Sequence, residues 1–303
     1  MARFIDPTTD FGFKRLFGRE DSKEILQQFL YDILSLSSPI VEIEYLPTEQ
    51  LPFAIDDRVT IHDIYCKDAN GERFIVEMQR NWQHNFKDRT LYYSTYPITH
   101  QVEKGSNWQY ELLPIYVLSI LNFGIDRKPV YKRHVQLLDT VSKELFYDKL
   151  TFVYVELTKF KKELNDLVDD EDKWIYLLKR MPELADIPAD LAMDPYAKVL
   201  RLAELANLSF QDRLSYESSL KRSRDHYSIL ASAEYLGMQK GLKRGLEQGL
   251  QQGIEQGIEQ GIEQGIKLAQ MKTVQAMLAN GVDTALIATV VGWTVEEVET
   301  VTP

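Results

Sequence analysis

The stretch "DIYCKDANGERFIVEMQ", residues 63–79, contains two short apolar segments joined by the turn-forming residues "DANG". Apolar segments on either side of an Asn-Gly pair predict a β-hairpin. Asp63 opens the first segment, and Glu77 lies near the end of the second. Carboxylates are rare on strands that bury their side chains, so their place in this hairpin requires a physical reason.

The turn type determines which residue of the second strand faces Asp63. A two-residue type I′ turn places Asp63 opposite Met78 and turns Glu77 to the other face of the sheet. A type I turn that ends in a glycine bulge places Asp63 opposite Glu77, with Gln79 on the same face. We favour this second register, in which two like charges destabilise the sheet unless a cation lies between them. Carboxylate oxygens beside an amide suit Mg²⁺ or Mn²⁺.

The composition is that of a globular protein. The chain has 303 residues, of which 44% are hydrophobic and 27% charged, enough for one large domain with an appendage or for two modest domains. Cys66 is the only cysteine, which excludes an intrachain disulfide and fits a reducing cytosol. The N-terminus has no apolar signal core, and the apolar stretch 112–121 is too short to span a bilayer, so we expect it to form a buried strand.

The net charge limits the kind of nucleic-acid contact. At −11, the chain lacks the excess of basic residues that a nonspecific nucleic-acid coat requires. An enzyme that meets a phosphodiester through bound metal ions is less constrained, because the cations invert the local field. Charge therefore disfavours a simple binding module more than a metal-dependent enzyme.

Four regions are predicted along the chain. Residues 1–165 mix helical and strand patterns, and residues 166–235 have helical patterns broken by prolines. A glycine repeat helix occupies 236–268, and a small helical module occupies 269–303. Within the first region, apolar spacing predicts helices over 22–36 and 86–104. The predicted strands are 40–46, 58–66, 73–80, 113–121 and 151–157.

The repeat has glycine at every fourth position from 237 to 265, and in most copies the next residue is Leu or Ile. A period of four advances about 40° per repeat on an α-helix, so the glycine and Leu/Ile stripes wind slowly around the axis. Each interior glycine destabilises a helix by roughly 1 kcal/mol relative to alanine. We expect either close packing against another helix, such as one from a second chain in a homo-oligomer, or a frayed, solvated linker.

The last region has the spacing of a helix-turn-helix. Ala288, Gly292 and Val298 are placed as the small residue, the turn glycine and the second-helix anchor of that motif. The predicted second helix carries three glutamates and no basic residue. Because an acidic face repels phosphate, we favour a packing or interaction module over a DNA reader.

The hairpin resembles the active-site signature of the PD-(D/E)XK nuclease superfamily, in which an Asp and an (Asp/Glu)-x-Lys pair occupy adjacent strands. The chain is closer still to the Rpn branch, the recombination-promoting nucleases or putative transposases. The likeness covers most of 1–270 and includes "DPTTDFGFKRLFG" (6–18), "EMQR" (77–80), "RTLYYSTY" (89–96) and the glycine repeat. It implies an α/β fold with a restriction-endonuclease-like core, a central mixed sheet flanked by helices, followed by a helical C-terminal region.

The resemblance implies metal-dependent hydrolysis of DNA by an endonuclease linked to recombination or mobile elements. Asp63 and Glu77 would hold Mg²⁺ or Mn²⁺, which lowers the pKa of water and stabilises the charge on the phosphorus oxygens. Gln79 replaces the usual Lys, as it also does in the Rpn-like branch, and would orient the attacking water. Lys14 would stabilise the same developing charge as a further catalytic group.

The substrate contacts are expected on the helix after the strands. Arg89 would contact a backbone phosphate, and Tyr93 would contact the substrate beside it. The tyrosines of this helix are also suited to a hydrophobic core. Folding roles such as a cap or a salt bridge are equally compatible with Lys14 and Arg89. In the favoured register His62 points to the face opposite Asp63, where we expect it to be packed or hydrogen-bonded and not a ligand.

Other chemistries lack their motifs. The chain has no phosphate-binding G-x-x-x-x-G-K-[ST] loop, no dinucleotide glycine fingerprint after a strand and no metalloprotease histidine spacing. The competing hypothesis is a nuclease fold of weak or no activity that serves as an oligomerisation or partner-binding scaffold. No membrane partner is expected.

Overall fold

The computed structural model describes residues 2–50, 60–101 and 111–302. It divides into two compact units, Met1–Asp225 and His226–Pro303. The helix α6 (Phe210–Ala279) runs through the boundary between them. In the described residues, no helix combines the length and the apolar character that a membrane crossing requires.

A six-stranded mixed sheet forms the centre of the first unit, with strand order β1-β4-β5-β6-β8-β7. The parallel pairs are β5 with β6 and β6 with β8, and the remaining pairs are antiparallel. The strands are β1 (Ile43–Tyr45), β4 (Ile64–Asp68), β5 (Arg73–Gln79), β6 (Ile115–Leu121), β7 (Lys132–Leu138) and β8 (Leu145–Glu156). The short strands β2 (Glu49–Gln50) and β3 (Thr60–Ile61) pair separately. The expected mixed sheet flanked by helices is confirmed.

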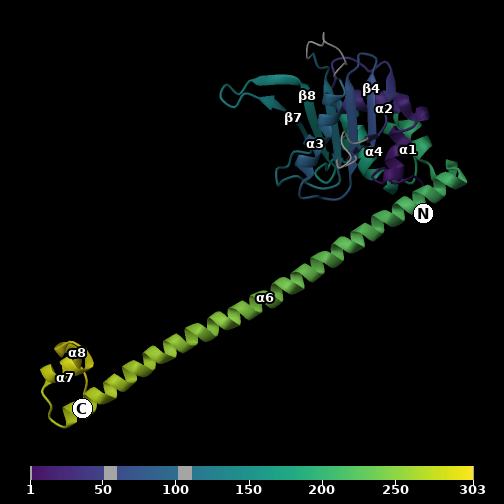
Figure 1. Ribbon diagram of the computed structural model, residues 1–303. Coiled ribbons are helices and arrows are strands. Elements are labelled where there is room, and N and C mark those ends of the chain that lie inside the picture. The colour runs from purple at the N-terminus through teal and green to yellow at the C-terminus, as the bar shows by residue number, and fades with distance from the viewer. Residues whose placement is uncertain (1, 51–59, 102–110, 303) are drawn as a thin grey trace. The chain divides into compact units, whose positions relative to one another are not determined.

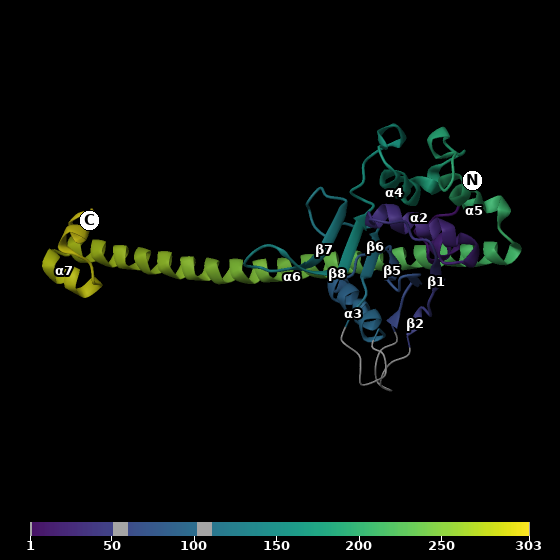
Figure 2. The ribbon, with the colours of Figure 1, turned by 90° about the horizontal axis from the view of Figure 1, so that it is seen from above.

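The helices of this unit cover both faces of the sheet, as Figures 1 and 2 show. They are α1 (Asp10–Phe17), α2 (Lys23–Leu34), α3 (Phe86–Thr99), α4 (Asp170–Arg180) and α5 (Tyr196–Ala203). Helices α1, α2, α4 and α5 share one hydrophobic cluster with one face of the strands. Residues of α3 and of the segment just after β6 pack on the other face, in a second cluster that includes Tyr65 and Ile75. Strand alternation places Glu77 on the same face as Ile75, and therefore on the side of α3.

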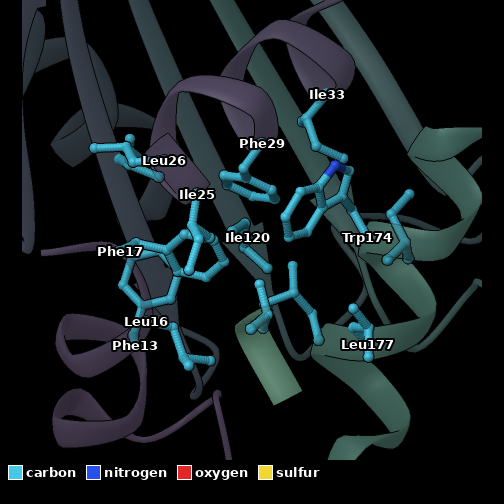
Figure 3. Close-up of a cluster of buried hydrophobic side chains, with 14 of the residues drawn as sticks. Phe13, Leu16, Phe17, Ile25, Leu26, Phe29, Ile33, Ile120, Trp174 and Leu177 are labelled. Atoms are coloured by element: carbon cyan, nitrogen blue, oxygen red, sulfur yellow. The ribbon is translucent and has the colours of Figure 1, made fainter. Parts of the chain in front are cut away.

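The larger cluster is built on aromatic contacts, shown in Figure 3. The ring of Phe29 lies 4.5 Å from that of Phe17 and 5.4 Å, edge-on, from that of Trp174, measured between centroids. All three side chains are almost completely buried. Trp174 also donates its indole N–H to Asp32, at 2.7 Å, so its polar atom is satisfied inside the core. These contacts join α1, α2 and α4 to one another.

Several predicted elements differ in extent. Strand β7 was not predicted, because its outer half is exposed and its pairing with β8 is irregular, which removes the alternating pattern. Strand β8 begins at Leu145, six residues before the predicted start, since this end is also exposed. The predicted helix 86–104 ends at Thr99 as α3, and its last residues lie outside the described ones.

The predicted strand 58–66 is interrupted. Its described part forms β3, then a break at His62 and Asp63, and then β4. The break arises because the chain changes partners, from β2 on one side to β5 on the other. Residues 58 and 59 lie outside the described residues.

The second unit contains the whole glycine repeat and a small terminal cluster. The repeat is helical, a Cβ added at any of its glycines meets no atom within 4 Å, and its Leu and Ile side chains are more than half exposed. Helices α7 (Thr284–Val291) and α8 (Val295–Glu299) follow. Ala288 and Val298 are buried in one cluster and Gly292 ends α7 with a φ of 72°, as the helix-turn-helix spacing predicts. Packing of the repeat against a second chain stays a prediction.

Candidate active site

The turn between β4 and β5 is the bulged type. The backbone N–H of Asp68 donates to the carbonyl of Glu72 at 3.0 Å, and that of Gly71 donates to the carbonyl of Asp68 at 3.1 Å. Gly71 has a φ of +83°, a conformation that glycine adopts without strain. A Cβ at this position would also lie 2.7 Å from Cδ1 of Leu113. The backbone conformation therefore favours glycine at the bulge, whereas the end of the Leu113 side chain can shift to make room.

This turn sets the predicted register. Ile64 pairs with Val76, so the residues one step further along, Asp63 and Glu77, face each other. Asp63 lies just before the first residue of β4, and Glu77 lies within β5. The favoured register of the hairpin is confirmed, and the alternative with Asp63 opposite Met78 is wrong.

Each of the two carboxylates is held by the other residue's strand. The backbone N–H of Asp63 donates to Oε1 of Glu77 at 3.3 Å, and that of Met78 donates to Oδ2 of Asp63 at 2.8 Å. Within the described residues, the second oxygens, Oδ1 of Asp63 and Oε2 of Glu77, accept no protein hydrogen bond. The backbone thus anchors one oxygen of each carboxylate and leaves one available to a ligand.

The electrostatics of the pair are unfavourable without a cation. Burial raises the pKa of Asp63 well above its usual range, and the negative charge of Glu77 raises it further. The N–H of Met78 and the charge of Lys14 oppose this rise without cancelling it. The side chain of Glu77 is only 9% exposed, so water screens the repulsion weakly. The protein therefore holds two facing acids whose joint ionisation needs an added positive charge.

Lys14 supplies part of that charge from α1. Its ammonium lies 2.8 Å from Oδ1 of Asp10 and is partly exposed. Burial disfavours the charged form of Lys14, but the hydrogen bond to Asp10 and the charges of Asp10, Asp63 and Glu77 outweigh this and raise its pKa. Lys14 stays protonated, and its charge acts on the carboxylate pair while it also makes the folding contact with Asp10. Its expected role at the charge that develops on the phosphate stays a prediction.

The N-terminal segment folds so that α1 reaches the end of β5. Thr9 caps α1 by accepting the N–H of Gly12, at 3.1 Å. A Cβ at Gly12 would lie 2.1 Å from the carbonyl oxygen of Asp6, so only glycine permits this close approach. Asp6 in turn pairs with Arg80, the residue after β5, at 3.1 Å. These contacts account for much of the pattern in "DPTTDFGFK" and bring Lys14 to the site.

Gln79 is linked to the helix α3. Its Oε1 accepts a hydrogen bond from Arg89, and its Nε2 donates to the carbonyl of Asn81 at 3.0 Å. Arg89 also donates to Oε1 of Gln83 at 2.6 Å, and its guanidinium lies over the ring of Tyr93, 5.4 Å from the centroid. A cation from α3 therefore lies beside the glutamine that replaces the usual lysine.

Tyr93 joins this group from the same helix. Burial raises the pKa of its hydroxyl, the charge of Arg89 opposes the rise, and the charges of Glu77 and Asp63 add to it. The hydroxyl therefore lies within electrostatic reach of the carboxylate pair. Its neighbour Tyr92 is 51% exposed, so not every tyrosine of this helix serves the core.

The prediction for His62 is wrong in its direction. The side chain is completely buried, and Nδ1 lies 3.4 Å from Oε1 of Glu77, on the side of the site. The break between β3 and β4 disrupts the strand alternation on which the prediction rested. The ring packs edge-on against Tyr93, with centroids 5.0 Å apart. No sequence motif indicated a role for His62 at the site, although the sequence places it directly before Asp63.

The donor set suits a hard divalent ion. Two carboxylates each offer an oxygen without a protein donor, and such oxygens are the ligands that Mg²⁺ and Mn²⁺ prefer. Among the described residues, no cluster of three or more His, Cys, Asp or Glu side chains can hold a metal ion. This is compatible with Mg²⁺, which usually keeps several waters and takes only one or two carboxylates from the protein.

Comparison with known proteins adds an independent finding. The model of a family described as "PD-(D/E)XK nuclease family transposase" matches residues 7–233. The match covers the mixed sheet, its flanking helices and the start of α6. Neither the curated proteins nor the solved structures contain a match to the chain.

Proposed function

Since this chain belongs to the family of PD-(D/E)XK nuclease transposases, we propose that it is a Mg²⁺- or Mn²⁺-dependent endonuclease that hydrolyses phosphodiester bonds of DNA. The observation that carries the proposal is the pair of buried, facing carboxylates, Asp63 and Glu77, whose anchored geometry leaves one oxygen of each for a ligand. The family match supports a role in recombination or in mobile elements as part of this proposal, and the single cysteine, Cys66, supports a cytoplasmic location.

A divalent ion held by Asp63 and Glu77 would lower the pKa of water and offset charge on the phosphorus oxygens. The protein's own contribution is positioning. The two backbone N–H groups that anchor the carboxylates fix where the ion is held. Because the pKa of Asp63 is raised, ion binding at neutral pH must displace its proton or compete with it.

Gln79 is proposed to orient the attacking water. The hydrogen bonds to Arg89 and Asn81 fix the plane of its amide. An amide oxygen has two lone pairs and an amide nitrogen has two N–H groups, so one of each remains for water. Gln79 carries no charge, and the positive charge near the reacting phosphate comes from Lys14 and Arg89 in this proposal. Tyr93 would contact the substrate beside Arg89.

The test is plasmid cleavage by purified protein in Mg²⁺, Mn²⁺, Ca²⁺ or EDTA. We expect nicking with Mg²⁺ or Mn²⁺ that is lost in Asp63→Asn and Glu77→Gln, with both variants folded. Glu263→Gln, an exposed carboxylate of the repeat, is the control and should cleave as the wild type does. Cleavage by Asp63→Asn at the wild-type rate would remove the pair from the mechanism.

A second function is favoured by the exposed Leu/Ile stripe of the repeat. This stripe suits a scaffold that assembles copies of the chain or binds a partner, with the nuclease fold weakly active or inactive. Light scattering tests it, since assembly through the repeat predicts an oligomer that dissociates when Leu250, Ile254 and Ile258 are changed to Gln. Folded protein without cleavage in any metal would favour this function over the first.

A further inference from the structure

Among the described residues around the carboxylate pair, His62 makes contacts that the proposed mechanism leaves unexplained. Its side chain is fully buried, and within the described part of the chain neither ring nitrogen has a hydrogen-bond partner of normal geometry. Leaving a buried polar group unsatisfied costs about 1–3 kcal/mol, so a packing role alone would be better served by an apolar residue. The position therefore points to a function of the imidazole itself.

The ring of His62 lies beside the carboxylate of Glu77. Nδ1 lies 3.4 Å from Oε1 of Glu77, close enough for contact but not aligned as a hydrogen bond. The ring packs edge-on against Tyr93 at 5.0 Å and lies 5.8 Å from the ring of Tyr65. Its backbone N–H donates to the carbonyl of Thr48 at 3.0 Å. The aromatic contacts and this hydrogen bond hold the imidazole at the carboxylate.

Oε1 of Glu77 is the oxygen that already accepts the N–H of Asp63, at 3.3 Å. A donor at Nδ1 of His62 therefore adds a second anchor to the same oxygen and none to Oε2. Hydrogen bonds of this kind are often long before ligands bind and shorten in the complex. Groups that orient a metal-ligating carboxylate typically change metal affinity 10- to 100-fold when they are removed.

We propose that His62 is a positioning residue that holds Oε1 of Glu77 through Nδ1 and so directs Oε2 toward the divalent ion. This inference rests on the proposed function, since it assigns a role at the same site. It gives Glu77 two anchors on one oxygen, whereas Asp63 has a single anchor, the N–H of Met78. His62 itself is not a ligand of the ion in this proposal.

The test compares three substitutions by their affinity for Mn²⁺, measured by calorimetry or electron paramagnetic resonance without DNA. His62→Phe keeps an aromatic ring and removes the donor. His62→Asn keeps a nitrogen donor on Cγ, where Nδ1 is attached, and His62→Gln moves the donor one bond further. We expect Mn²⁺ binding to weaken about tenfold in His62→Phe and His62→Gln and to stay within about threefold of wild type in His62→Asn.

The control is His134→Phe on the edge strand β7, which should leave Mn²⁺ affinity unchanged. Circular dichroism and thermal melts test whether each variant is folded. If His62→Phe is unfolded, the difference in Mn²⁺ affinity between His62→Asn and His62→Gln still tests the inference. Equal affinity in wild type, His62→Phe and His62→Gln would overturn the inference and leave the nuclease proposal intact. Wild-type protein that does not bind Mn²⁺ would overturn both.

Discussion

The central sheet buries carboxylates in two regions, and only one of them supplies the compensating cations. Glu156, at the end of β8, is completely buried. Its oxygens contact Arg133 at 3.0 Å and Lys159 at 2.6 Å, and Oε2 also accepts the backbone N–H of Ile125 at 2.7 Å. At the Asp63–Glu77 pair, by contrast, the anchors are backbone N–H groups, and the charge of Lys14 only partly offsets the burial and repulsion that raise the pKa of Asp63.

The pKa values of acids in the two regions are shifted in opposite directions. Hydrogen bonds from Arg133 are the main reason that the pKa of Asp126, a member of the Glu156 cluster, lies well below its usual range. Burial and the charge of Glu77 move the pKa of Asp63 in the opposite direction. A buried acid with cations around it serves the fold, whereas facing acids with too few cations are set up to bind one. The difference separates a structural cluster from a candidate metal site.

The largest expected effect is on stability. Glu156→Gln leaves Arg133 and Lys159 without their buried partner and should lower the free energy of unfolding by about 3 kcal/mol. Glu77→Gln removes a repulsion while an amide oxygen can still accept the N–H of Asp63, so we expect a change below about 1 kcal/mol. Urea denaturation of both variants without metal measures the contrast. A loss as large in Glu77→Gln as in Glu156→Gln would break the comparison.

The next effect is on the pH dependence of stability. The pKa of Asp63 is raised in the folded state above its unfolded value of about 4, so between these two values the folded state binds more protons. Metal-free wild type should therefore lose stability as the pH rises through this window, by about 1.4 kcal/mol for each unit of separation. Asp63→Asn should lack this loss. Unfolding free energies of both proteins, measured at a series of pH values from 4 upward, test this loss. Parallel curves of stability against pH for wild type and Asp63→Asn would contradict the prediction.

The smallest expected effect comes from adding a cation to the site. Gln79→Lys gives the strand the usual lysine, but it also places a second positive charge against Arg89. Since contacting residues commonly couple by about 0.5–3 kcal/mol, we expect cleavage to fall about tenfold. Adding Arg89→Gln should restore it to within about threefold. Rates of plasmid nicking decide this, and full activity of Gln79→Lys alone would show that Arg89 does not fill the place of the lysine charge.

The sequence predicted the parts of the site that depend on local rules. The bulged turn at Gly71 and the facing of Asp63 and Glu77 follow from turn chemistry and strand periodicity, and both were found. The link between Gln79 and Arg89 was not predicted, because it depends on how α3 packs against β5. His62 was misplaced since its direction depends on β2, a strand whose pairing the local pattern does not reveal.

The same division holds for the fold. The buried strand β6 was predicted well, since all but one of its side chains are buried and its sequence is apolar except for Ser119. The edge strand β7 was missed because an exposed, irregularly paired edge carries neither an apolar run nor a regular alternation. The cluster around Glu156 was also invisible, because it joins charges from β7, β8 and the loops beside them.

The glycine bulge has a consequence for how this protein can evolve. Surface turns usually tolerate insertions and deletions, yet gaining or losing one residue between Asp68 and Glu72 would shift the pairing by one position. That shift would place Val76 or Met78 opposite Asp63 and turn the two carboxylates to opposite faces of the sheet. A length change in an exposed loop would thus remove the site as completely as the loss of a carboxylate. Related proteins that keep the two facing carboxylates should therefore differ in the residue types of this turn but not in its length.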